Sequence, residues 1–159
     1  MKNGNERKGG FTTMFQRIMV AYDGSDCANR ALAAGVDLMD RYDADLAVVM
    51  VAGLPDYAGT IGEVDEIQNE ARAFFDQKIR KVEELAGDRM ERVSTHLLFG
   101  HTGDKLVRFA KERDFDLVIV GARGFSRLQR IFLGSVSQFV VKYAHCPVLV
   151  IKDSCEPGK

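Results

Sequence analysis

The sequence of 159 residues has no tryptophan, three prolines and only three cysteines. Cys27, Cys146 and Cys155 cannot all pair within one chain, and no two of them form a C-x-x-C pair. Neither a disulfide framework nor a zinc or redox pair is therefore supported, and reduced thiols favour a cytoplasmic location. No apolar run approaches the roughly 18 residues of a membrane span, and the polar start lacks the apolar centre of a signal peptide. We expect no membrane partner.

Acidic residues are missing from one long segment, 117–152. The whole chain carries 22 basic and 23 acidic side chains, a formal net charge of −1, which argues against a nucleic-acid binder. The acid-free segment has a charge of +5, so the remainder of the chain carries −6. Its basic residues are Arg123, Arg127, Arg130, Lys142 and Lys152. Such a local excess predicts a small anionic partner held at one place.

Short apolar runs alternate with helical patterns from about residue 15 to residue 152. The patterns predict strands at 17–22, 46–51, 92–99, 116–120 and 148–151, and helices at 25–42, 63–86, 103–113 and 134–144. Phe74, Phe75 and the methionines are predicted in the core. This order is typical of a single doubly wound α/β domain, a five-stranded parallel sheet with helices on both faces. We expect residues 1–14 to be a flexible N-terminal extension, 15–152 the domain and 153–159 a C-terminal tail.

Two predicted strand ends carry residues unsuited to a core, namely 23–25 (DGS) and 121–124 (GARG). In open parallel sheets, ligands bind at the carboxyl ends of strands where the strand order reverses. Gly134-Ser135 then opens a helix, which completes the spacing G-x2-G-x9-G-S. We expect Gly121 and Gly124 to allow positive φ and close approach of N–H groups to phosphate oxygens, and residues 134–136 to add uncapped N–H groups. The spacing predicts a phosphate-binding loop.

Plainer interpretations of these residues stay open. The glycines could simply form turns and a helix cap, and Asp23 could accept bonds from nearby N–H groups in a turn. Arg123, Arg127 and Arg130 could be solvated side chains of a loop. Other motifs are absent: the sequence has no G-x-G-x-x-G, no G-x-x-x-x-G-K-[ST] and no G-x-S-x-G. The three histidines lack metal-ligand spacing. The sequence therefore predicts no catalytic residue and no metal ligand.

Four stretches, RIMVAYDGS, DLVIVGARG, LGSVSQFVV and CPVLVIK, resemble the universal stress protein family, and the likeness covers residues 15–152. The glycine spacing matches the ATP-binding branch of that family. The resemblance implies a Rossmann-like fold of the adenine nucleotide α-hydrolase type, with strand order 3-2-1-4-5. It implies ATP as the ligand, with Mg²⁺ coordinated mainly by the phosphates. Asp23 would contact the adenosine portion, with Ala21 and Val51 beside the base. Val120 and Gly121 would line the nucleotide. The phosphates would be held by Gly124, Gly134, Ser135 and Val136, with Arg123 as a further candidate.

The leading hypothesis is an ATP-binding regulatory protein of the stress response that acts through nucleotide-dependent conformation or assembly. A slow ATPase, an adenylating enzyme of related fold and an interaction module that binds no nucleotide remain alternatives, which product analysis would separate. The strand at 148–151 is expected at a sheet edge, guarded only by Pro147 and Lys152. The resemblance also points to a homodimer formed through this strand.

Overall fold

Five parallel strands form one sheet in the order β3-β2-β1-β4-β5. The computed structural model describes residues 14–53, 61–124 and 133–152. The strands are β1 (Arg17–Ala21), β2 (Asp45–Ala52), β3 (Val93–Phe99), β4 (Leu117–Gly121) and β5 (Val148–Ile151). Both the predicted fold class and the predicted strand order are confirmed. Arg127 and Arg130, together with the predicted terminal extension up to residue 13 and the tail 153–159, lie outside the described residues.

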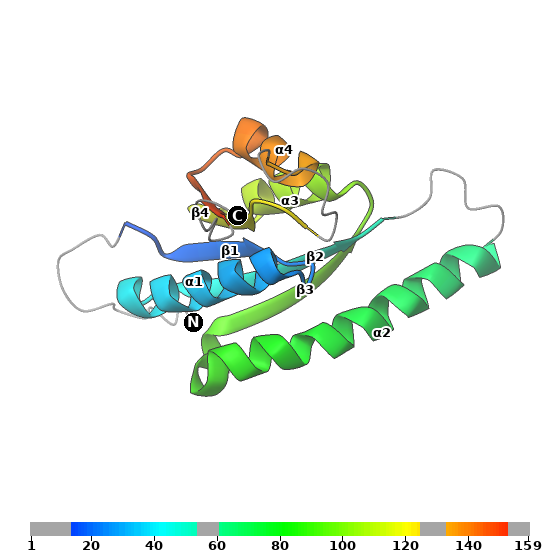
Figure 1. Cartoon of the computed structure of the whole chain (residues 1–159), viewed down its shortest axis with the longest axis horizontal. Coiled ribbons are helices and arrows are strands. Elements are labelled where there is room, and N and C mark those ends of the chain that lie inside the picture. The colour runs from blue at the N-terminus through cyan, green and yellow to red at the C-terminus, as the bar shows by residue number, and fades with distance from the viewer. Residues whose placement is uncertain (1–13, 54–60, 125–132, 153–159) are drawn as a thin grey trace, which may run out of the picture.

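Helices cover the sheet on both sides, with α1 and α2 on one face and α3 and α4 on the other (Figure 1). They are α1 (Asp26–Tyr42), α2 (Ile61–Ala86), the 3₁₀ helix η1 (Gly87–Arg92), α3 (Thr102–Glu112) and α4 (Ser135–Tyr143). The N-cap of α1 is Ser25, as its sequence predicts, because the hydroxyl accepts a bond of 3.3 Å from the N–H of Ala28. Within the described ranges, no helix is long and apolar enough to cross a membrane.

The core has two halves because side chains alternate across the sheet. Along β1, Ile18 and Val20 pack towards α1 and α2, whereas Met19 packs towards α3 and α4. Helix α1 lies close to this strand: a Cβ built on Gly35 would be 2.6 Å from Cγ2 of Val20. Glycine at this position therefore permits the close packing of helix and sheet.

Helix α2 extends beyond the sheet, and this differs from the sequence prediction. Of its residues only Val82 and Ala86 are buried, while Phe74 is 42% exposed and Ile61 is 85% exposed. A helix of 26 residues spans about 39 Å, whereas the seven residues of β3 span about 23 Å. The first half of α2 accordingly has no strand beneath it (Figure 1). The prediction that Phe74 lies in the core is wrong, as it is for Met14, which is 70% exposed.

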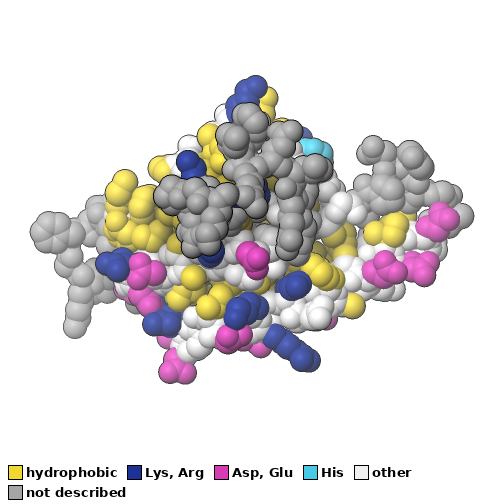
Figure 2. Space-filling view, in the orientation of Figure 1, with side chains coloured by type: hydrophobic (Ala, Val, Ile, Leu, Met, Phe, Trp, Pro, Cys, Tyr) yellow, Lys and Arg dark blue, Asp and Glu magenta, His cyan; other side chains and the backbone are white. Residues whose placement is uncertain are grey.

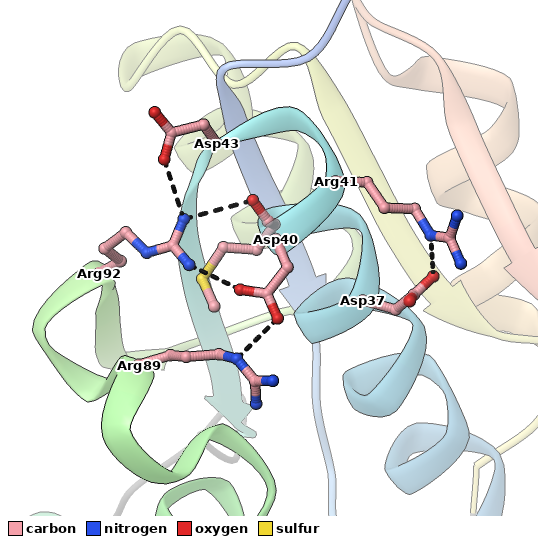
Figure 3. A network of polar contacts seen from close by, with 7 residues as sticks. Asp37, Asp40, Arg41, Asp43, Arg89 and Arg92 are labelled. Atoms are coloured by element: carbon pink, nitrogen blue, oxygen red, sulfur yellow. Dashed lines mark hydrogen bonds and ion pairs between the residues drawn. The ribbon is translucent and has the colours of Figure 1, made fainter.

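An arginine network ties η1 to the end of α1 (Figure 3). Arg92 donates to Asp40 at 2.6 Å and to Asp43 at 3.3 Å, and Arg89 contacts the other oxygen of Asp40 at 2.6 Å. Arg92 also donates to the carbonyl of Met39, one of the last carbonyls of α1, at 3.4 Å. These contacts fix where the chain enters β3.

Candidate functional site

The strand order reverses between β1 and β4, which lie side by side with Ala21 opposite Val120. The chain leaves β1 towards β2 on one side, and after β3 it crosses to β4 on the other side. A cavity of about 190 Å³ opens at these carboxyl ends, and we call it the switch-point cavity. Every predicted site residue lines it: Ala21, Asp23, Val51, Val120, Gly121, Arg123, Gly124, Gly134, Ser135 and Val136. The fold thus brings four separate segments to one place.

Asp23 connects two loops of this cavity. Its Oδ1 accepts a bond of 2.9 Å from the N–H of Ser25, which is the turn role that the sequence left open. Its Oδ2 lies 2.7 Å from the position that a Cβ on Gly124 would occupy. The side chain therefore stabilises the turn after β1 and also faces the loop after β4. One carboxylate oxygen serves the turn, and the other points towards the glycine loop.

The glycines of the loop are needed for close packing, not for unusual backbone angles. Among the described glycines, positive φ occurs at Gly24, Gly87 and Gly100. The prediction of positive φ at Gly121 and Gly124 is therefore wrong. The glycine at the end of β4 allows α1 to begin against the strand, because a Cβ there would lie 2.8 Å from Cβ of Cys27 and 3.0 Å from its carbonyl carbon.

Helix α4 begins at this cavity without a side-chain cap. Its N-cap is Gly134, with φ −64° and ψ 160°, and no side chain of the described residues caps the helix. The N–H of Gly134 donates to the carbonyl of Ala122 at 2.7 Å, which holds the helix start against the loop after β4. The next residues, Ser135 and Val136, line the cavity. Uncapped N–H groups and the positive end of a helix dipole suit an anionic group.

Ser137 holds the start of α4 against the loop after β4, and it was not among the predicted site residues. The side chain is 2% exposed, and its hydroxyl lies 2.9 Å from the carbonyl oxygen of Ala122 and 2.8 Å from that of Gly134. It bridges the loop after β4 and the start of α4. The signal that could have identified it is a second serine in the first turn of a helix, where hydroxyls bond to neighbouring backbone groups.

Further residues line the cavity that the sequence prediction did not include. They are Tyr22, Ala28, Val49, Thr102 and Leu106. Val49 and Leu106, with the predicted Val51, belong to the core on the α3 side, so this wall of the cavity is apolar. Thr102 begins α3 after the third strand, a strand end whose polar residues could have indicated it.

Polar contacts hold Tyr22 in place beneath the site. Its hydroxyl donates to Oδ1 of Asn29 at 2.7 Å. Burial raises the pKa of this phenol, and the neighbouring Asp23 raises it further, so Tyr22 is a neutral donor at physiological pH. Over the described ranges, no group of three or more His, Cys, Asp or Glu side chains is arranged to hold a metal ion.

A model of the universal stress protein family matches residues 14–152. The chain belongs to this family. A universal stress protein of Methanocaldococcus jannaschii, MJ0531, is 30% identical over 141 residues, which cover 87% of this chain and 83% of the relative. The Bacillus subtilis universal stress protein YxiE is 32% identical over 148 residues, which cover 87% of this chain and all of the relative.

Solved structures of the family share the fold. The universal stress protein UspA from Lactobacillus plantarum has a TM-score of 0.75 and 26% identity, with 86% of this chain and 97% of that chain covered. A universal stress protein from Archaeoglobus fulgidus, solved in complex with dAMP, has a TM-score of 0.63 and 27% identity, with 87% and 99% covered. The second of these relatives binds an adenine nucleotide.

Proposed function

We propose that this universal stress protein binds ATP in the switch-point cavity and acts as a regulatory protein of the stress response. The observation that carries the proposal is the convergence of an apolar wall, the Asp23 carboxylate and the uncapped start of α4 on one cavity. Nucleotide-dependent conformation or assembly would transmit the signal. Mg²⁺ would be coordinated mainly by the phosphates. Cys146 is a free thiol, which fits the cytoplasmic location that we propose.

Each part of the nucleotide has chemically suitable residues. The apolar wall with Ala21 and Val51 would contact the base, since a flat aromatic ring gains most from apolar surroundings. Asp23 would accept bonds from ribose hydroxyls through the oxygen that the Ser25 N–H does not use. Residues 134–136, with Gly124 and Arg123, would bind the phosphates. The dAMP complex of the Archaeoglobus fulgidus relative supports an adenine nucleotide as the ligand class.

Calorimetry with two nucleotides on two variants tests this assignment. Asp23→Ala removes a proposed adenosine contact and should weaken ATP and AMP alike, by about tenfold or 1.4 kcal/mol. Ser135→Ala removes a hydroxyl from the proposed phosphate side and should weaken ATP more than AMP. Ser94→Ala is a matched control, because this exposed serine at the start of β3 does not line the cavity. Thermal unfolding without nucleotide checks that each variant is folded.

Three results would contradict the proposal in different ways. Equal losses for ATP and AMP in Ser135→Ala would mean that the phosphates are misplaced. No ATP binding by the parent protein would remove the nucleotide function altogether. Turnover is the third: release of ADP would make the protein an ATPase, and release of AMP with pyrophosphate would make it an adenylating enzyme. A regulator binds ATP and leaves it intact over the same period. Mass spectrometry of small molecules released from the heat-denatured protein gives an independent reading.

A further inference from the structure

A second cavity, of about 350 Å³, lies at the amino-terminal edge of the sheet. We call it the amino-edge cavity. The starts of β1, β2 and β3 and the end of α3 surround it. It shares no lining residue with the switch-point cavity, which lies at the carboxyl ends of the strands. Its volume is within the range of about 300–1,000 Å³ that is usual for small-molecule pockets.

The hollow exists because small side chains meet large aromatic ones. Ala47 and Ser94 are paired across β2 and β3, and both line the cavity. Three rings line it as well: Phe109 lies 5.0 Å from His96 and 5.8 Å from Phe115, measured between ring centroids. Both phenylalanines are at least nine-tenths buried, so the rings are held by the core. We call these three side chains the aromatic wall.

Two guanidinium groups lie against this wall. Cζ of Arg17 is 5.4 Å from the centroid of Phe115, and Cζ of Arg113 is 5.6 Å from that of Phe109. Within the part of the chain that the structure describes, the ion pairs of arginine use other residues, and neither the Arg17 nor the Arg113 guanidinium pairs with a carboxylate. The backbone N–H of Arg17 donates to the carboxylate of Asp116 at 3.1 and 3.2 Å, which leaves the guanidinium unused. When the flat face of a guanidinium lies on an aromatic ring, the N–H groups along its edge remain available to an acceptor. The arrangement of these N–H groups matches the two oxygens of a carboxylate.

The other charged groups of the rim limit the charge of a ligand. Asp45, Glu91 and Arg92 also line the cavity, and Arg92 is already paired with Asp40 and Asp43. The two exposed carboxylates nearly balance the two stacked guanidiniums, so a polyphosphate would meet as much repulsion as attraction. A ligand with a single negative charge, held between the two guanidiniums, gains their attraction with less repulsion from the carboxylates.

His96 adds to the aromatic surface as a neutral ring. Burial lowers its pKa, and the positive charge of Arg113 lowers it further, so the imidazole is uncharged at neutral pH. Its Nε2 lies 3.0 Å from the hydroxyl of Ser94. The histidine therefore offers a ring face without adding a third positive charge.

We propose that the amino-edge cavity binds a small aromatic monocarboxylate. The ring of the ligand lies against His96, the side chain of the aromatic wall that is only partly buried, and its carboxylate lies between Arg17 and Arg113. The ligand is chemically unlike ATP and binds at the opposite end of the sheet. This proposal stands independently of the nucleotide function and is tested without nucleotide.

The test titrates naphthoate into the full-length protein, followed by amide NMR and calorimetry. We expect a dissociation constant of about 1 mM or lower, with shifts at the amides that surround the amino-edge cavity. The double variant Arg17→Gln with Arg113→Gln should weaken binding by about tenfold or more, because both charge-assisted contacts are lost. Naphthylmethanol, which has the same ring and no charge, should bind correspondingly less well. Lys111→Gln is a matched control, since this exposed charge on α3 does not line the cavity.

A filling variant separates the cavity from the charges. Ser94 is exposed on a strand where an aromatic residue is well tolerated, so Ser94→Phe should occupy the hollow and abolish binding without unfolding the protein. Circular dichroism confirms the fold of each variant. The proposal is overturned if naphthoate does not bind, if all variants bind it equally, if the neutral alcohol binds as tightly, or if the shifts lie around the switch-point cavity.

Discussion

At the residue scale, the glycines of the loop after β4 have different roles although they belong to one sequence pattern. Gly121 lies where α1 begins against β4, so its missing side chain is a condition of folding. Gly134 has ordinary backbone angles, and the nearest atom to a Cβ there would be the carbonyl oxygen of Ala122 at 3.4 Å. A pattern of glycines therefore does not say which of them a ligand requires.

Alanine substitutions distinguish the two roles. Gly121→Ala should lower the free energy of unfolding by about 1–3 kcal/mol, because the added methyl overlaps Cys27 at 2.8 Å. Gly134→Ala should cost less than about 1 kcal/mol, the difference between glycine and alanine at an N-cap. Urea unfolding of both variants measures this. If both variants lose the same free energy of unfolding, the close contact at the end of β4 relaxes without cost. A weaker affinity of Gly121→Ala for ATP would then be an effect on binding.

Ser137 shows why the site could be predicted only in part. Asp23, Arg123, the glycines and the start of α4 were identified from the residues, because glycines and polar groups at strand ends differ visibly from apolar strands. Ala21, Val51 and Val120 were predicted only from the resemblance to the family. Ser137 was missed because a serine inside a helix pattern is unremarkable until its neighbours in space are known, and Thr102 because the end of the third strand was not considered. The angles at Gly121 and Gly124 were mispredicted for the same reason: a glycine required by a neighbouring helix and one required by a turn are identical in the sequence.

At the scale of elements, the strands followed from the sequence and the long helix only partly did. Runs such as 117–120 are apolar on both sides, which only a buried strand explains. The apolar stripe of α2 indicated a helix correctly, but it contains no information on how far the sheet beneath it extends. Phe74 and Phe75 were both predicted in the core, but only Phe75 packs against it, and the side chain of Phe74 is 42% exposed. Figure 2 shows that hydrophobic side chains are exposed on this face of the molecule.

The link between η1 and α1 offers a test at this scale. Arg92→Gln should lower the free energy of unfolding by about 1–2 kcal/mol, because it removes a half-buried cation that bonds to Asp40, Asp43 and the end of α1. Arg41→Gln is the control: its pair with Asp37, at 2.7 Å, is nearly as short as the 2.6 Å pair of Arg92 with Asp40, but it lies exposed on the surface of α1 (Figure 3). That substitution should leave the unfolding midpoint unchanged. Similar losses in the two variants would mean that the network does not couple the elements.

At the scale of the whole molecule, the strand order leaves β5 at one edge of the sheet. Leu149 on this strand is 37% exposed, and on the neighbouring α4 Val141 is 48% and Tyr143 is 51% exposed. An apolar edge strand beside an apolar helix surface favours pairing with a second copy. The homodimer predicted from the sequence remains a prediction, and these exposed side chains support it.

Substitution on the edge strand tests the homodimer. Leu149→Lys with Val150→Lys should convert a dimer of about twice 17.7 kDa into monomers, because charges on both faces of the strand oppose its pairing. Val148 is left intact, since it packs against the core on the α3 side. Phe74→Lys is the matched control, an exposed apolar side chain on α2 far from the edge. Sedimentation at tens of micromolar decides: a monomeric parent protein excludes the dimer, and monomers produced by Phe74→Lys but not by the β5 variant would place the interface on α2.

If the parent is dimeric and the β5 variant is monomeric, sedimentation with and without ATP then shows whether the nucleotide changes assembly, because a ligand that binds the dimer more tightly must also strengthen dimerisation.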